Sequence, residues 1–108
     1  MSDYESKLVR FVKNIHKNTV EGKIQWTESI YREQFEATIG TNIIRIKFVH
    51  GEPVLSLLNQ AEVQLESIES SDITNIEANA NLHELYSLAR RRAMNLDNLL
   101  DELNSKLD

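Results

Sequence analysis

The C-terminal segment from Asn81 to Leu107 reads NLHELYSLARRRAMNLDNLLDELNSKL, and its apolar pattern constrains the fold more than any other part of the chain. Leucine and alanine recur at spacings of three and four residues, the period of one helix face, over about seven turns. The members of this row are Leu82, Leu85, Ala89, Ala93, Leu96, Leu100, Leu103 and Leu107. We expect one long C-terminal helix whose apolar face packs on the protein's own sheet or on a second subunit.

Leu88 and Leu99 form a second apolar row beside the main one, and Arg92 lies between them. Together the two rows widen the apolar arc of the helix to about 160°. A helix that lies on a sheet beside one other helix buries an arc of this width, whereas an exposed remainder would be a subunit contact. Leu88, Leu99 and Arg92 are therefore the candidate oligomer contacts, and we expect a homo-oligomer.

An amphipathic N-terminal helix is predicted from about Tyr4 to Glu21, because apolar residues recur at the helical period and the opposite face is basic. The apolar positions are Tyr4, Leu8, Phe11, Val12, Ile15 and Thr19. Gly22 is a natural helix stop. After it, Ile24 and Trp26 alternate with polar residues, which indicates an extended lead-in to the next element.

The middle of the chain alternates between apolar and polar residues, which is typical of antiparallel strands covered on one side. Four such runs lie at residues 35–39, 44–48, 55–57 and 63–65. They are separated by the turn sequences Gly40-Thr41, His50-Gly51-Glu52-Pro53 and Asn59-Gln60-Ala61. This pattern predicts a four-stranded antiparallel meander.

The loop lengths predict the register of this meander. A two-residue loop at Gly40-Thr41 places Ala37 opposite Ile44, Phe35 opposite Ile46 and Glu36 opposite Arg45. A four-residue loop at residues 50–53 places Phe48 opposite Leu55 and Ile46 opposite Leu57. Apolar residues then face apolar residues in both hairpins, so the two predicted registers agree with each other.

Residues 66–80 are polar, and we expect them to form a connection with a short helical turn after Ser71 or Asp72. Asn81 then caps the last helix, with Glu84 three residues later as in a capping box. The predicted order is α-β-β-β-β-α in a single domain of residues 1–108. The expected fold class is α+β, with both helices on one sheet face.

The composition excludes several classes of protein. The 108 residues contain no cysteine, which excludes disulfides, thiol catalysis and cysteine-based zinc sites. No apolar run reaches about eighteen residues, so no membrane span is expected. The polar start at Ser2-Asp3-Tyr4-Glu5 is unlike a secretory signal. We therefore expect a cytoplasmic protein that does not bind membranes.

The net charge of -5 is unevenly distributed along the chain. Residues 1–26 hold five basic and three acidic side chains (+2), residues 27–81 three basic and nine acidic (-6), and residues 82–108 four basic and five acidic (-1). An acidic domain with a weakly basic first helix makes a poor nucleic-acid binder. We do not expect nucleic acid as a partner.

No catalytic or metal-binding motif is present. His16, His50 and His83 are not spaced as metal ligands, and three glycines cannot build a phosphate-binding loop. We therefore expect no metal site, no cofactor and no catalytic residue. An enzyme would require His83 or His16 to converge with carboxylates, and it is the third of the functions considered.

Arg90-Arg91-Arg92 is the sharpest polar feature of the sequence, since Arg90 and Arg92 flank the leucine row of the predicted helix. Three roles stay open for Arg92. It can extend along the apolar margin or pair with an acid of the sheet, anchor a dimer, or hold a phosphate or carboxylate of a ligand.

Four further residues are candidate contacts for a ligand or partner. Trp26, the only tryptophan, either covers the edge of the core or stacks on a flat ligand together with Tyr31. Arg45 and Lys47 lie on the outer face of the predicted sheet, which is either a solvated face or a platform for a polar ligand. A site for an anionic nucleotide would combine Arg90 and Arg92 with Trp26 and Tyr31.

Two segments carry a resemblance to short uncharacterised α+β proteins of bacteria and their phages. They are Gly22-Lys23-Ile24-Gln25-Trp26 and the run Leu85-Tyr86-Ser87-Leu88-Ala89-Arg90-Arg91-Arg92-Ala93, with its Leu-Tyr-x-x-Ala-Arg motif. The resemblance implies a helix, a small antiparallel meander and a closing helix. It implies no established activity, and it suggests a mobile-element context in which small proteins bind host proteins or sequester nucleotide signals.

The leading functional hypothesis is a non-enzymatic binding protein, homo-oligomeric through its last helix, that acts by occupying a partner protein. The second is a sponge that sequesters an anionic nucleotide-type signalling molecule. The two differ in an observable way, because a sponge is stabilised by its ligand and a protein-occupying module is not.

Overall fold

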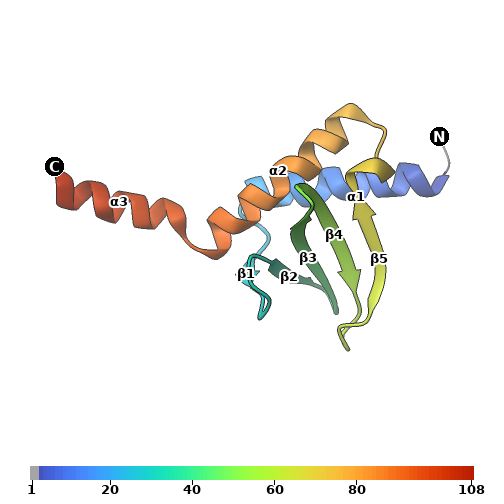
Figure 1. Ribbon diagram of the computed structural model, residues 1–108, viewed down its shortest axis with the longest axis horizontal. Helices are drawn as coiled ribbons and strands as arrows, with labels where there is room; N and C mark the ends of the chain where they lie inside the picture. Colours follow the sequence, from blue (N-terminus) through green and yellow to red (C-terminus); the bar gives the residue numbers. More distant parts are fainter. Residues whose placement is uncertain (1–2) are drawn as a thin grey trace.

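The computed structural model describes residues 3–108 as an α+β fold with an antiparallel sheet (Figure 1). The elements in chain order are α1 Asp3–Val20, β1 Thr27–Glu28, β2 Phe35–Ile39, β3 Asn42–Val49, β4 Glu52–Leu58, β5 Gln64–Glu69, the 3₁₀ helix η1 Ser70–Asp72, α2 Ile76–Ala93 and α3 Leu96–Leu107. The sheet has the order β1-β2-β3-β4-β5. The predicted fold class is confirmed, whereas the prediction of four strands is wrong.

The additional strand is β1, where the sequence predicted only an extended lead-in. Thr27 pairs with Glu36 and Glu28 pairs with Phe35, which places β1 at the edge of the sheet. Both residues of β1 are exposed. A strand of two exposed residues has no alternation of burial, so its sequence carries no strand signal.

The β2–β3 hairpin has the predicted register. Ala37 faces Ile44, Phe35 faces Ile46 and Glu36 faces Arg45. Gly40, in the turn, has a φ of +62°, a conformation that glycine adopts without steric cost. Apolar pairs on one face and an acid–base pair on the other therefore identified this pairing correctly.

The predicted register of β3 and β4 is wrong by two residues. Ile46 faces Leu55 and Phe48 faces Pro53, because the turn consists of two residues, His50 and Gly51, rather than four. Both turn residues have positive φ angles, 52° and 79°, as a tight type I′ hairpin requires. A shift of two residues leaves every side chain on its predicted face.

β5 runs to Glu69, into the stretch that was predicted as a connection. Its residues are mostly exposed, with Ile68 the buried exception, so the alternation that marks a strand is weak. A register shift between Leu57 and Leu58 interrupts its pairing with β4. A short helical turn is present, but η1 runs from Ser70 to Asp72 and so lies before the predicted position after Ser71 or Asp72.

α2 begins five residues before the predicted start at Asn81. Asn75 is the N-cap, and its side-chain oxygen accepts a 2.9 Å hydrogen bond from the backbone N–H of Ala78. Ala78 is buried and extends the apolar row of α2 by one turn towards the N-terminus. The cap prediction missed it because a buried alanine is a weak apolar signal.

The prediction of one continuous C-terminal helix is also wrong. α2 ends at Ala93, and Met94 and Asn95 form an elbow before α3 begins at Leu96. Asn95 adopts the left-handed conformation with φ 53°, which asparagine tolerates better than most residues. The leucine and alanine spacing runs through the elbow unchanged, so periodicity alone did not reveal it.

α1 and α2 cover the same face of the sheet, as predicted, and pack against each other (Figure 1). Buried side chains from both helices and from four strands, β2 to β5, form the core. They include Val12, Ile46, Leu55, Ile68, Leu82 and Leu85. Across residues 3–108, no helix combines the length and the apolar character that a membrane span needs.

Candidate functional site

α3 projects away from the body formed by α1, α2 and the sheet (Figure 1), and none of its residues is buried. Its leucines follow a spacing of four, three and four residues at Leu96, Leu100, Leu103 and Leu107, and Leu99 lies beside them. Leu100, Leu103 and Leu107 are 57%, 44% and 84% exposed. This leucine row has the spacing of a coiled-coil seam, and within residues 3–108 it is exposed from Leu99 onwards, with Leu96 partly buried at the elbow.

Three polar contacts lie at the elbow between α2 and α3. Arg91 forms an ion pair of 3.3 Å with Asp97 across the bend, and the side-chain amide of Asn98 donates to that of Asn95 over 2.9 Å. The backbone N–H of Leu99 donates to the carbonyl oxygen of Asn95 over 3.2 Å. Only the Arg91–Asp97 pair spans the bend, and because its side chains are 54% and 63% exposed it contributes little to the direction of α3.

The elbow separates the residues predicted to form one oligomer contact. Leu99 lies exposed on α3, whereas Leu88 lies half-buried on α2. The second apolar row required an unbroken helix from one to the other, and the structure does not contain it. Leu99 remains beside the leucine row, and Leu88 does not share its surface.

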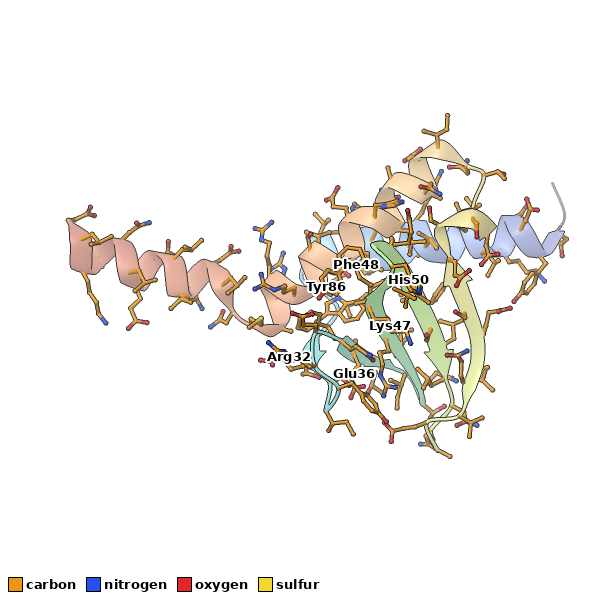
Figure 2. The ribbon with its side chains drawn as sticks, viewed as in Figure 1. Arg32, Glu36, Lys47, Phe48, His50 and Tyr86 are labelled. Carbon is orange, nitrogen blue, oxygen red and sulfur yellow. The ribbon has the colours of Figure 1, made fainter. Side chains whose placement is uncertain are left out.

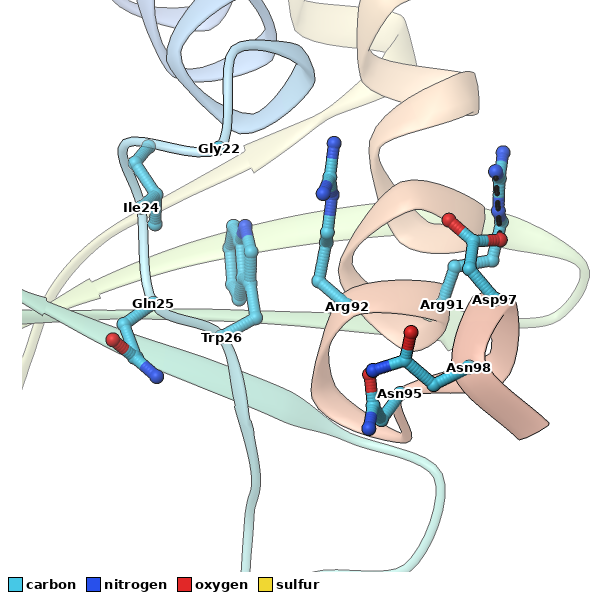
Figure 3. Close-up of a pocket in the computed structure, with 9 residues that line it drawn as sticks. All are labelled: Gly22, Ile24, Gln25, Trp26, Arg91, Arg92, Asn95, Asp97 and Asn98. Atoms are coloured by element: carbon cyan, nitrogen blue, oxygen red, sulfur yellow. Dashed lines mark hydrogen bonds and ion pairs between the residues drawn. The ribbon is translucent and has the colours of Figure 1, made fainter. Parts of the chain in front are cut away.

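Arg92 and Trp26 meet at a hollow of about 350 Å³ on the inner side of the elbow (Figure 3). Its lining is Gly22, Ile24, Gln25, Trp26, Arg91, Arg92, Asn95, Asp97 and Asn98. Trp26 is only 3% exposed, and its Nε1–H donates a 3.0 Å hydrogen bond to the hydroxyl of Thr19. The indole is therefore a fixed wall of this hollow and part of the core, as the core-edge interpretation expected.

The other two members of the predicted nucleotide site lie elsewhere. Arg90 is exposed on α2 and does not line the hollow. The ring of Tyr31 lies 5.2 Å from the guanidinium carbon of Arg45, on the sheet. The structure therefore brings together Arg92 and Trp26 but not Arg90 and Tyr31.

The predicted platform on the outer sheet face is an ion-pair network. Arg45 donates to Glu36 through Nε and Nη2 over 3.0 and 2.8 Å, and Nη2 also lies 3.2 Å from Glu62. The Arg45 side chain is 13% exposed. Lys47 lies on the same face and is partly buried. Two carboxylates thus neutralise Arg45, which favours the structural interpretation of this face.

Two histidines approach carboxylates, a feature that sequence spacing did not reveal. His16 Nε2 lies 3.2 Å from Glu84, and His83 Nε2 lies 3.5 Å from Glu52. His83 Nε2 also lies 3.1 Å from the hydroxyl of Ser70. Both contacts of His83 use the same ring nitrogen, whereas a nucleophile–base–carboxylate relay uses both nitrogens.

His50 and the acidic side chains are the remaining candidate groups for binding a ligand or metal. His50 lines a neighbouring hollow of about 430 Å³ with Glu52 and Ser70. Within residues 3–108, no group of three or more histidine, aspartate or glutamate side chains is arranged to hold a metal ion.

An aromatic cluster that the sequence did not predict joins α2 to the sheet. The ring of Tyr86 lies 4.2 Å from that of Phe48 and 5.5 Å from that of Phe35, measured between centroids (Figure 2). The Tyr86 hydroxyl donates to the backbone oxygen of Glu33 over 3.0 Å. Burial raises the pKa of Tyr86; the negative charge of Glu33 adds to this shift and the positive charge of Arg90 opposes it.

No family model, no curated protein and no solved structure matches this chain. Its resemblance to short bacterial and phage proteins therefore stays a prediction. Function has to be inferred from the geometry of the chain itself.

Proposed function

We propose that this chain is a non-enzymatic binding protein that acts by occupying a partner protein, and that it self-associates through the leucine row of α3. The observation that carries the proposal is this leucine row, which is exposed from Leu99 onwards. A bacterial or phage setting, in which small proteins of this kind act, is part of the proposal.

The energetics of α3 support this role. Full burial of one leucine side chain contributes about 1.5 to 3 kcal/mol, so several leucines in one row provide enough free energy for association. An isolated helix shorter than about 12 to 15 residues is marginally stable in water. A twelve-residue helix away from the body therefore gains stability when its apolar face enters a groove on another protein.

The test compares one double variant and one single variant of α3 with the wild-type chain, each used as bait. Leu100→Glu with Leu103→Glu places charge in the leucine row, and Ser105→Glu places charge on the opposite helix face as a matched control. A partner captured by the wild-type chain and by Ser105→Glu, but not by the double variant, is the expected result. Equal capture by all three chains would contradict the role of α3.

A sponge for an anionic nucleotide is the second candidate, and one observation favours it. Arg91 and Arg92 both line the hollow at the elbow, whose volume is about 350 Å³. Arg91 is already paired with Asp97 and Arg92 with a backbone carbonyl, so a ligand would have to displace these bonds. This makes the sponge the weaker candidate.

Thermal unfolding with and without nucleotides tests the sponge. A ligand at about 100 times its Kd would stabilise the fold by about 2.7 kcal/mol. We expect no shift with mono-, di- or cyclic nucleotides. A shift that disappears in Arg92→Ala would replace the leading proposal with the sponge, and conversion of the nucleotide would indicate an enzyme.

A further inference from the structure

An apolar groove runs along α1, at the end of the sheet that α2 leaves uncovered. Two adjoining hollows of about 290 and 510 Å³ form it, and they share Phe11 and Ile39 as lining residues. Its other apolar walls include Ile24, Ile44, Leu57 and Leu65, and polar side chains of α1 and the segment after it also line the larger hollow. This end of the sheet is uncovered because α2 crosses the sheet near the β3–β4 turn, at the end opposite the β4–β5 turn (Figure 1).

The groove exposes apolar surface that an isolated chain does not bury. Leu65 is 60% exposed and Ile39 is 40% exposed, on the sheet face that elsewhere forms the core. An uncovered apolar face at the end of a core marks a place where another element packs. The chain thus carries two unpaired apolar surfaces, the groove and the leucine row of α3.

We propose that the groove receives α3 of a second copy of this chain. The proposal rests on the proposed role of α3 and names the partner and the surface that it meets. The leucine row from Leu96 to Leu107 is about 16 Å long at 1.5 Å per residue. Its leucines, all on one helix face, would pack on the apolar side chains Phe11, Ile39 and Leu65 of the groove.

The charges beside the two surfaces are complementary. α3 carries Asp97, Asp101 and Glu102 against Lys106, a net charge of -2. The basic side chains on this side come from α1 and the segment after it, and two of them have acidic neighbours, since Lys23 pairs with Glu21 over 2.9 Å and Lys7 with Asp3 over 3.5 Å. Lys23 lines the groove, and Lys7, Arg10 and Lys17 are exposed on α1. An acidic helix is therefore attracted to this side of the body and oriented there.

The elbow makes the second copy, rather than the same chain, the source of α3. α3 projects away from its own body (Figure 1), and the exposed Arg91–Asp97 ion pair bridges the bend. If each copy places α3 in the groove of the other, both grooves are filled and the assembly closes as a two-fold dimer.

Single-cysteine variants test this contact without interference, because the natural chain contains no cysteine. Leu65→Cys labels the groove and Leu103→Cys labels α3, and both positions are exposed enough to tolerate the change. The first variant is labelled with ¹⁵N, the two are mixed in equal amounts and oxidised mildly, and mass spectrometry identifies the linked peptides. Gln64→Cys, on the other sheet face, with Ser105→Cys, on the other face of α3, is the matched control pair.

The expected main product is a disulfide between positions 65 and 103 that joins a labelled to an unlabelled chain, with little product from the control pair. A main product linking position 103 to position 103 would contradict the groove as the surface that α3 meets. It would still be consistent with self-association through α3. A further sample is one chain that carries both Leu65→Cys and Leu103→Cys. A disulfide within a monomer of that chain would show that α3 enters the groove of its own chain and not that of a second copy. Absence of any disulfide, with a monomer mass, would overturn the contact, and the partner-capture experiment would still decide the proposed function.

Discussion

The guanidinium group of Arg92 donates a 3.0 Å hydrogen bond to the backbone carbonyl oxygen of Val20, which ties the end of α2 to the end of α1. The neighbouring carbonyls of Lys17, Asn18 and Thr19 accept bonds from the chain that follows α1. Arg92 thus binds a carbonyl at a helix C-terminus, where a positive charge is favourable. This structural role differs from the three roles that the sequence left open for Arg92.

Replacing Arg92 by Ala should lower the free energy of unfolding by about 1 kcal/mol, because an exposed charge-assisted bond and its interaction with the helix end are lost. Urea unfolding measures this change. Arg90→Ala, which removes an exposed arginine of the same helix turn, should have a smaller effect. Equal destabilisation by the two variants would show that the bond to Val20 contributes nothing specific.

The left-handed conformation of Asn95 gives a second prediction. Asn95→Val should destabilise the elbow by about 1 to 2 kcal/mol, because a β-branched residue with positive φ is sterically strained. Asn95→Gly should be tolerated, since glycine adopts this conformation freely. Urea unfolding distinguishes the two, and equal stability of both variants would argue against a bent elbow.

The buried bond between Trp26 and Thr19 gives a third prediction. Thr19→Val keeps the shape of the side chain but leaves the indole N–H without its acceptor, which should cost about 1 to 3 kcal/mol. Fluorescence of the only tryptophan reports unfolding directly. Thr19→Ser retains the acceptor and should keep the native emission maximum, whereas a stable Thr19→Val chain would contradict the bond.

These residues show what sequence reasoning could and could not provide. The Glu36–Arg45 pairing was predictable, because the turn length and the matching of side chains on both faces agreed on one register. The β3–β4 register was not, because His50 gives no local sign that it will adopt a positive φ. The elbow at Asn95 was hidden since the leucine spacing continues through it.

The candidate site was likewise predictable from the sequence only in part. Exposed leucines near the C-terminus were predictable from their period, but their isolation from the body depended on the direction of α3 after the elbow. Trp26 was correctly placed at the core edge. Its separation from Tyr31 followed from the pairing of β1, a strand too short to be predicted.

The raised pKa of Tyr86 gives a prediction at alkaline pH. Because burial favours the neutral phenol in the folded chain, its contribution to stability is complete below about pH 10, the ordinary tyrosine value, and is lost as the pH rises through the higher folded pKa. Tyr86→Phe keeps the ring but cannot ionise. Its stability should therefore fall less steeply above pH 10 than that of the wild-type chain, and identical pH profiles would contradict the burial of this hydroxyl.

The mass of the intact assembly tests the role of the leucine row most directly. Native mass spectrometry is applied to the wild-type chain, to Leu103→Glu and to Ser105→Glu at the same concentration. We predict a dimer for the wild-type chain and for Ser105→Glu, and a monomer for Leu103→Glu. A wild-type monomer, or a dimer that persists in Leu103→Glu, would contradict self-association through α3.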